Sequence, residues 1–281
     1  MRLLRHSLAL LGLVAVAACD RDNGPTDTSI GSRAFVRYVN AVPDTAALDF
    51  RFVDGQIQDS PQTFTGTAFR SLGLGGYRDI APGSRRMRAF VNDTNITVAS
   101  RIILDTTFTF EAGKYYSILH TGFVRSGASP RNFIRVYEDA RPENPGGGNV
   151  AVRVVHAAVG APNVDAYIVD AAATTLPATP TAANVPFLAA SGWVTTPARA
   201  LGLRVQAGAT PVIASTTANA NGPVAGTTTG VNQPSTDLPP GVNVGGAVYT
   251  AWVLPAVGFG TGAATSTPTV LWTLDRRIPR P

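Results

Sequence analysis

Two stretches of the chain share one pattern of alternating apolar and polar positions and align without a gap. Residues 34–54 read AFVRYVNAVPDTAALDFRFVD, and residues 150–170 read VAVRVVHAAVGAPNVDAYIVD, at a spacing of 116 residues (150 − 34). Side chains that alternate in this way point to opposite faces of a β-strand. An internal repeat of this kind predicts two copies of one β-rich module.

Each stretch reads as two strands around a short turn, so we predict a hairpin in each copy. In such a hairpin Arg37 faces Asp49, and Arg153 faces Asp165. Opposite charges directly across a strand pair contribute about 0.2–1 kcal/mol. We therefore predict two cross-strand ion pairs, on the face opposite to an apolar face. The apolar face of the first copy would consist of Val36, Tyr38, Leu48, Phe50 and Phe52.

The remaining chain also favours strands over helices, since 28 glycines and 21 prolines favour short strands joined by turns. A stretch rich in glycine and proline at 141–149 reads as a linker. We predict an all-β protein of two tandem immunoglobulin-like antiparallel β-sandwich domains, residues 34–140 and 150–281, each of about seven strands. Strands are expected at 86–91, 96–103, 115–119, 133–137, 201–205, 247–253 and 270–274, and an extended surface loop at 207–237.

The N-terminus predicts export from the cytoplasm. Arg2 and Arg5 precede the apolar run 8–16, which is typical of a secretory signal peptide. The sequence Val-Ala-Ala-Cys at 16–19 resembles the lipobox of bacterial lipoproteins. The resemblance implies that residues 1–18 are removed and that Cys19 carries acyl chains, with 19–33 as a flexible tether. The alternative is an ordinary signal peptide that leaves Cys19 as a free thiol.

The composition limits the kinds of metal, ligand and macromolecular partner that the protein is expected to bind. Cys19 is the only cysteine, so the mature chain has no internal disulfide and no cysteine metal site. The formal net charge is +5, and no nucleic-acid-binding motif is present. We expect a monomer without a cofactor, attached through its N-terminal lipid to the extracytoplasmic side of a bacterial membrane, with an envelope polysaccharide or protein as ligand and no nucleic acid.

Several short motifs carry a resemblance to a known family. They are Val-Arg-Val-Val-His-Ala at 152–157, Pro-Asn-Val-Asp-Ala-Tyr at 162–167 and Ala-Gly-Lys-Tyr-Tyr at 112–116. In these motifs the chain resembles the bacterial and archaeal domain-of-unknown-function family 4397, in two copies that cover nearly all of 34–274. The first copy departs from the pattern with Asn40 at the position of His156. The resemblance implies exported, often lipid-anchored β-sandwich proteins without an assigned activity.

His156 is the one residue on which an enzymatic hypothesis can be built. It alternates with Val152 and Val154 on its strand, so we expect its side chain to face the core and to form a hydrogen bond with the following loop. The alternative is an extracytoplasmic hydrolase in which His156 acts with a carboxylate. The aspartates 49, 54, 165 and 170 lack the Asp-x-Asp-x-Asp spacing of a calcium loop, so ion-pair and turn roles are expected.

Two further groups of residues could contact a ligand. Arg85, Arg86 and Arg88, with Arg70 and Arg78, could contact anionic lipid or polysaccharide, or form a solvated strand face. Trp193, Trp252 and Trp272 could stack on sugars, although their apolar surroundings favour core packing. We expect a non-catalytic binding or envelope-organising module that uses its loops, 207–237 above all; the alternatives are the hydrolase and a purely architectural spacer.

Overall fold

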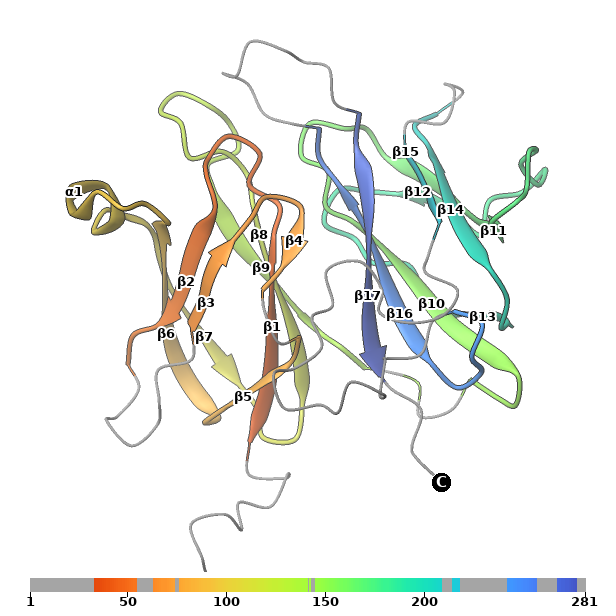
Figure 1. The fold of residues 1–281 in the computed structure, drawn as a ribbon, viewed down its shortest axis with the longest axis horizontal. Helices are drawn as coiled ribbons and strands as arrows, with labels where there is room; N and C mark the ends of the chain where they lie inside the picture. Colours follow the sequence, from red (N-terminus) through yellow and green to blue (C-terminus); the bar gives the residue numbers. More distant parts are fainter. Residues whose placement is uncertain are drawn as a thin grey trace, which may run out of the picture.

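The computed structural model describes residues 33–54, 63–73, 76–140, 142, 145–208, 214–217, 242–256 and 267–276. The fold is all-β, as predicted: seventeen strands form four sheets, and the one helix in these ranges, α1 (Ile96–Ala99), is a single turn. Sheets 1 and 2 come from residues 33–140, here called the N-terminal half. Sheets 3 and 4 come from the described residues 142–276, the C-terminal half (Figure 1).

The N-terminal half is built around β1, which runs parallel to β8 and pairs antiparallel with β4 and β5 on its other side. Sheet 1 has the order β4–β1–β8–β9, and sheet 2 the order β3–β2–β6–β7. The strands are β1 (Ala34–Asn40), β2 (Leu48–Phe52), β3 (Thr63–Thr67), β4 (Ser71–Leu72), β5 (Arg78–Ile80), β6 (Gly83–Val91), β7 (Ile102–Phe110), β8 (Tyr115–Thr121) and β9 (Phe133–Glu138).

The C-terminal half has the corresponding plan, with β10 parallel to β16. Sheet 3 has the order β13–β10–β16–β17, and sheet 4 the order β12–β11–β14–β15. The strands are β10 (Asn149–His156), β11 (Val164–Asp170), β12 (Ala182–Val185), β13 (Val194–Pro197), β14 (Leu201–Gln206), β15 (Ala214–Thr217), β16 (Val248–Leu254) and β17 (Thr269–Arg276).

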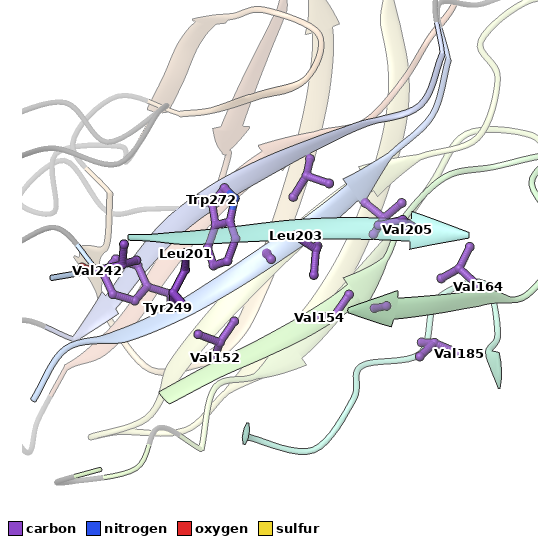
Figure 2. Packing of buried hydrophobic residues seen from close by; sticks show 14 of the residues in the cluster. Val152, Val154, Val164, Val185, Leu201, Leu203, Val205, Val242, Tyr249 and Trp272 are labelled. Atoms are coloured by element: carbon purple, nitrogen blue, oxygen red, sulfur yellow. The ribbon is translucent and has the colours of Figure 1, made fainter. Parts of the chain in front are cut away.

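Each half encloses its own hydrophobic core between its two sheets. In the C-terminal half, Val152 and Tyr249 of sheet 3 and Leu201 and Leu203 of sheet 4 belong to one buried cluster between the two sheets (Figure 2). In the N-terminal half, the rings of Tyr38 and Phe50 stack across the core with centroids 4.5 Å apart. Two sheets packed face to face over such a core are consistent with a β-sandwich in each half.

A third apolar cluster lies between sheets 1 and 3, which face each other in the middle of the molecule (Figure 1). The four sheets therefore form layers in the order 2–1–3–4. The inner strands of sheets 1 and 3, which are β1, β8, β10 and β16, are buried on both faces, because each has a core on one side and the other half on the other. The cluster consists of Val39, Ala41, Leu72, Leu119 and Tyr137 from one half and Val155, Ala157, Trp252, Leu254 and Leu271 from the other.

The predicted hairpins are wrong, although the predicted apolar residues are buried. β1 lies in sheet 1 and β2 in sheet 2, and likewise β10 lies in sheet 3 and β11 in sheet 4. The turn after β1 thus carries the chain across the core to the opposite sheet. Val36 and Phe50 still face the same core, but from opposite sides. An alternating pattern identifies the buried face of each strand and leaves open which strand is its neighbour.

Two smaller expectations also need correction. Residues 96–103 were predicted as one strand, but 96–99 form α1 because the Asn95 side chain caps it by accepting from Thr97 N, and the strand begins only at Ile102. The predicted loop 207–237 contains β15, which pairs with β14; most of the remaining loop lies outside the described residues.

Candidate functional site

A group of charged side chains is buried between sheets 1 and 3. Arg37 on β1 and Arg153 on β10 are 1% and 5% exposed, and Asp139 and Asp275 are 4% and 3% exposed. Burial of four charged side chains is uncommon and requires that they be paired and hydrogen-bonded. The group, called the central cluster below, consists of Arg37, Ser117, Asp139, Arg153, Thr250 and Asp275.

Each arginine of the central cluster pairs with the aspartate of the other half. Arg37 Nη1 lies 2.6 Å from Asp275 Oδ1, while its Nη2 lies 3.9 Å from Asp139 of its own half. Arg153 Nη2 pairs with Asp139 Oδ1 and lies 3.7 Å from Asp275 Oδ2. The two ion pairs are therefore reciprocal, and both cross the boundary between the halves.

A hydroxyl group in each half connects the arginine to the aspartate of the same half. Arg37 Nε donates to Ser117 Oγ at 2.7 Å, and Ser117 donates to Asp139 at 2.6 Å. Arg153 Nε donates to Thr250 Oγ1 at 2.8 Å, and Thr250 donates to Asp275 at 2.5 Å. Strand register explains the match, because each hydroxyl residue lies opposite its arginine in the parallel pairs β1–β8 and β10–β16.

An aromatic ring covers each guanidinium group. The Arg37 guanidinium carbon lies 4.6 Å from the centre of the Tyr77 ring, and that of Arg153 lies 4.8 Å from the Trp193 ring. Burial raises the pKa of Tyr77 well above its usual value, so its hydroxyl stays protonated and donates to Asp139 at 2.6 Å. Although burial disfavours charge on Arg37, Asp275 and other neighbours raise its pKa, so it stays charged.

The central cluster has the properties of a structural device. Its two positive and two negative charges balance, and they are already engaged with one another. A buried ion pair adds little net stability compared with an apolar pair, but removal of one partner leaves a buried charge and costs about 3–5 kcal/mol. Any other arrangement of the two halves would separate these charges and would cost free energy. The four charged side chains of the cluster are buried and are therefore not available to bind a substrate.

Two residues with left-handed backbone conformation add further contacts between the halves. Arg70 (φ 61°) donates from Nε and Nη2 to the Pro255 carbonyl oxygen at 2.8 and 2.6 Å. Leu188 (φ 67°) accepts from the Tyr137 hydroxyl at its carbonyl oxygen, 3.0 Å away. Such conformations cost energy for residues other than glycine. Arg70 and Leu188 occupy corresponding positions in the two halves. The backbone N–H of Arg70 donates to the carbonyl oxygen of Asn40 at the end of β1, and that of Leu188 donates to the carbonyl oxygen of His156 at the end of β10.

His156 has both ring nitrogens engaged with the backbone. Ala158 N donates to Nδ1 at 3.3 Å, so Nδ1 carries no proton, and Nε2 lies 3.0 Å from the Pro162 carbonyl oxygen, to which it donates. The ring is fully buried, and burial lowers its pKa. His156 therefore bonds the following loop, as predicted. Asn40 serves in the same way at its position, because its Oδ1 accepts from Val42 N at 3.0 Å.

His120, which received no role in the sequence analysis, is also buried. Its Nδ1 lies 2.9 Å from the Tyr38 hydroxyl, and its Nε2 lies 3.0 Å from Asn132 Oδ1. Burial lowers the pKa of His120 to about 4, so the ring is neutral under ordinary conditions. The arrangement Tyr38–His120–Asn132 resembles a catalytic relay in composition, but it lies inside the N-terminal half without access to solvent.

The aspartates of the predicted ion pairs have other partners than the arginines assigned to them. Asp49 accepts from Arg51 at 2.9 Å and from Gly66 N at 2.8 Å. Burial by itself would raise the pKa of Asp49, but these hydrogen bonds outweigh it and lower the pKa. Asp165 accepts from Asn184 N at 2.7 Å. The predicted pairs Arg37–Asp49 and Arg153–Asp165 are thus wrong, because each arginine points away from its own core toward the other half.

The remaining candidate residues are dispersed. Arg86 and Arg88 both pair with Asp105, at 2.7 and 2.8 Å, and Arg86 above all lowers the pKa of Asp105 to about 2. Trp252 and Trp272 are buried as predicted, while Trp193 is only half-buried. Within the described ranges, no three histidine, cysteine, aspartate or glutamate residues converge as a metal site requires.

A groove of about 390 Å³ opens between β12 and β13, the terminal strands of sheets 4 and 3. Trp193 lies at its border with the central cluster. Asn184 and Ser191 also line it, together with small residues such as Ala183 and Gly192. The sequence analysis missed this groove because its walls come from two sheets whose packing the local pattern does not specify.

Comparison with known proteins finds a match for part of the chain. Residues 34–167 match the model of a family described as a domain of unknown function, DUF4397. This match supports DUF4397 as the family of that segment. It covers the whole N-terminal half together with β10 and most of β11, and the DUF4397 description carries no activity. No curated protein matches the chain.

Two features of the sequence prediction fall outside what the structure describes. Cys19 and the signal peptide precede Arg33, the first described residue, and so does almost all of the tether. Among the residues that are described, no helix is both long and apolar enough to cross a membrane.

Proposed function

We propose that this protein is a lipid-anchored, extracytoplasmic bacterial protein in which two tandem DUF4397 modules, each an immunoglobulin-like sandwich, form one rigid, non-catalytic binding unit. The reciprocal ion pairing of the central cluster is the observation that carries this proposal. Its charged side chains are engaged in fixing one half against the other, instead of facing a cleft. A rigid body of two joined modules presents its edges and loops in fixed relative positions, which favours recognition of an extended ligand.

The matching register of the two halves supports the assignment of two modules. Arg37 and Arg153 lie opposite Ser117 and Thr250 in their parallel strand pairs. The antiparallel strand pairs agree as well. Asp49 lies opposite Phe90 on β6, and Asp165, at the matching position of the second copy, lies opposite Gln206 on β14. The two partner residues, Phe90 and Gln206, are separated by the same 116 positions (206 − 90) as the aligned stretches. The repeat found in the sequence thus extends to strand pairings far beyond the aligned stretch.

The hydrolase alternative depends on His156, and the geometry of that residue disfavours it. A general base needs a free ring nitrogen within reach of a substrate proton. Both nitrogens of His156 are bonded to the backbone, and the ring is fully buried. The architectural spacer remains the second candidate, because a rigid unit would also serve as a spacer.

Lipid attachment is tested by metabolic labelling with palmitate in a bacterium that processes lipoproteins. We expect label in the wild-type protein and none in the Cys19→Ser variant, because Cys19 is the only cysteine. Label that persists in Cys19→Ser would exclude the lipobox assignment, and absence of label from both proteins would indicate an ordinary signal peptide.

Binding is tested by immobilising the mature Cys19→Ser chain and passing over it an envelope extract from the producing bacterium. The proposal predicts that a polysaccharide or protein is retained by the folded chain and not by a heat-denatured sample. If the folded chain retains nothing beyond the denatured control, the binding unit is contradicted and the spacer is favoured.

A further inference from the structure

The lining of the groove between β12 and β13 indicates the chemistry of a ligand. Its walls are formed by residues 181–186 and 189–194, and none of these carries an ionisable side chain. Its volume of about 390 Å³ lies within the range of about 300–1,000 Å³ that is usual for small-molecule sites. A groove of this size without charge suits a neutral ligand, because a charged group would lose its hydration without gaining a partner.

Trp193 gives the groove an aromatic wall of fixed orientation. The Arg153 guanidinium lies 4.8 Å from the ring centre, and the indole N–H donates to the Ala140 carbonyl oxygen at 2.9 Å. These contacts hold the ring in place and occupy its single polar group. The part of Trp193 that lines the groove therefore offers apolar ring surface, on which the C–H face of a sugar can pack.

Neutral hydrogen-bonding groups accompany this ring. Asn184 is exposed, and its Oδ1 accepts from Asn163 at 3.0 Å, which orients its amide NH2 group as a donor. The Thr181 hydroxyl oxygen accepts from Ile168 N at 2.9 Å, which leaves its proton available for donation. An oriented amide and a hydroxyl that line the same groove as an aromatic ring form a set that matches the hydroxyl groups and apolar face of a sugar.

We propose that this groove binds a neutral glycan, with a sugar ring packed on Trp193 and its hydroxyl groups bonded by Asn184 and Thr181. The inference rests on the proposed binding function and names its site and ligand class. An added peptide strand fits the groove less well. Asn184 in β12 has a φ of 49°, and its N–H already donates to Asp165, so β12 does not present a regular edge for pairing.

Gly192 offers a variant that blocks the groove without damage to the fold. It is exposed and lines the groove, and a Cβ atom placed on it would meet no neighbouring atom within 4 Å. Because Gly192 lines the groove and has free space around its Cβ position, we expect a leucine side chain there to occupy part of the groove. Gly147 is a matched control, because it is also exposed, has the same free space and lies outside the groove.

The experiment uses the mature Cys19→Ser chain labelled with ¹⁵N and titrated with neutral tetrasaccharides of glucose, mannose and galactose. Amide resonances are followed by NMR at sugar concentrations up to about 10 mM, which detects a Kd near 1 mM. We expect at least one sugar to shift the resonances of residues 181–194. Gly192→Leu should weaken that binding at least tenfold, and Gly147→Leu should leave it unchanged.

Three outcomes would overturn the inference: no tetrasaccharide shifts residues 181–194, a sugar binds Gly192→Leu as well as the wild type, or only an extended peptide binds the groove. The immobilised-chain experiment separates these failures from failure of the proposed function. If envelope material is retained equally by wild type and Gly192→Leu, the groove assignment is wrong and the binding function stands. If neither retains anything, both proposals fail.

Discussion

The two buried histidines in the described part of the chain each have both ring nitrogens hydrogen-bonded. At His120, Tyr38 and Asn132 occupy both nitrogens, and at His156 the backbone does so. Protonation of His156 would place a proton on Nδ1, opposite the Ala158 N–H. Burial lowers the pKa of both histidines in the folded protein, while the hydrogen bonds to Asn132 and to the Pro162 carbonyl oxygen act in the opposite direction.

A pH dependence of stability follows for His120. Its pKa is about 4 when folded and about 6.5 when unfolded, so between these values the unfolded chain binds the additional proton. Stability should thus fall as pH is lowered from 7 to 4, with a contribution from His120 on the order of 3 kcal/mol. Urea unfolding of wild type and His120→Gln across this range measures it. An equally steep loss in His120→Gln would contradict the assignment.

The replacement His156→Asn distinguishes a structural histidine from a catalytic one. Asn40 already fills the corresponding position and accepts from Val42 N as His156 accepts from Ala158 N. We expect His156→Asn to cost less than about 1.5 kcal/mol, whereas His156→Leu leaves Ala158 N unsatisfied and should cost about 1–3 kcal/mol more. Denaturant unfolding of both variants gives the comparison. Equal stability of the two would show that this hydrogen bond has no structural role.

Prediction at the residue scale succeeded where it needed only the local pattern. The alternation of Val36 and Tyr38 identified core residues, and the alternation of Val152 and Val154 placed His156 with them. It failed for Arg37, because a charged residue on the face away from the core is normally solvated, and only the packing of a second half buries it.

At the scale of single elements, strands that are buried on both faces carry a signal that the hairpin interpretation did not use. All seven residues of β16 are buried, and β10 is buried at every position after Asn149. Such strands read as nearly continuous apolar runs, whereas a strand with one solvated face alternates. Apolar residues on both faces of β10 and β16 therefore indicate a covered outer face, although the identity of the covering sheet cannot be obtained from them.

The loop from β8 to β9 depends on one glycine. Gly122 has a φ of +86°, and a Cβ atom there would lie 2.6 Å from the Arg131 carbonyl oxygen. Gly122→Ala should destabilise the protein by more than about 1 kcal/mol, because it combines an unfavourable backbone conformation with a clash. Gly147→Ala, which has free space and no positive φ, is the matched control for thermal unfolding. A Tm for Gly122→Ala equal to that of the control would contradict the packing of this loop.

For the whole molecule, the central claim is that the two halves are joined as one body by reciprocal pairs. The sequence predicted the repeat and the all-β class. It could not predict this arrangement, because Arg37 and Asp275 are 238 positions apart (275 − 37) and no local pattern relates them. In the structure, the separate cores of the two halves are connected by the apolar cluster between sheets 1 and 3 and by the central cluster within that boundary.

The most direct test is a double-mutant cycle on Arg37 and Asp275, measured by urea unfolding of the mature chain. Arg37→Met and Asp275→Asn should each cost about 3–5 kcal/mol, and the double variant less than their sum, with a coupling energy of at least about 1.5 kcal/mol. The exposed pair Arg86–Asp105 serves as control, with an expected coupling below about 1 kcal/mol. Coupling between Arg37 and Asp275 that is no larger than the control would contradict a joined body; the account predicts a clearly larger value.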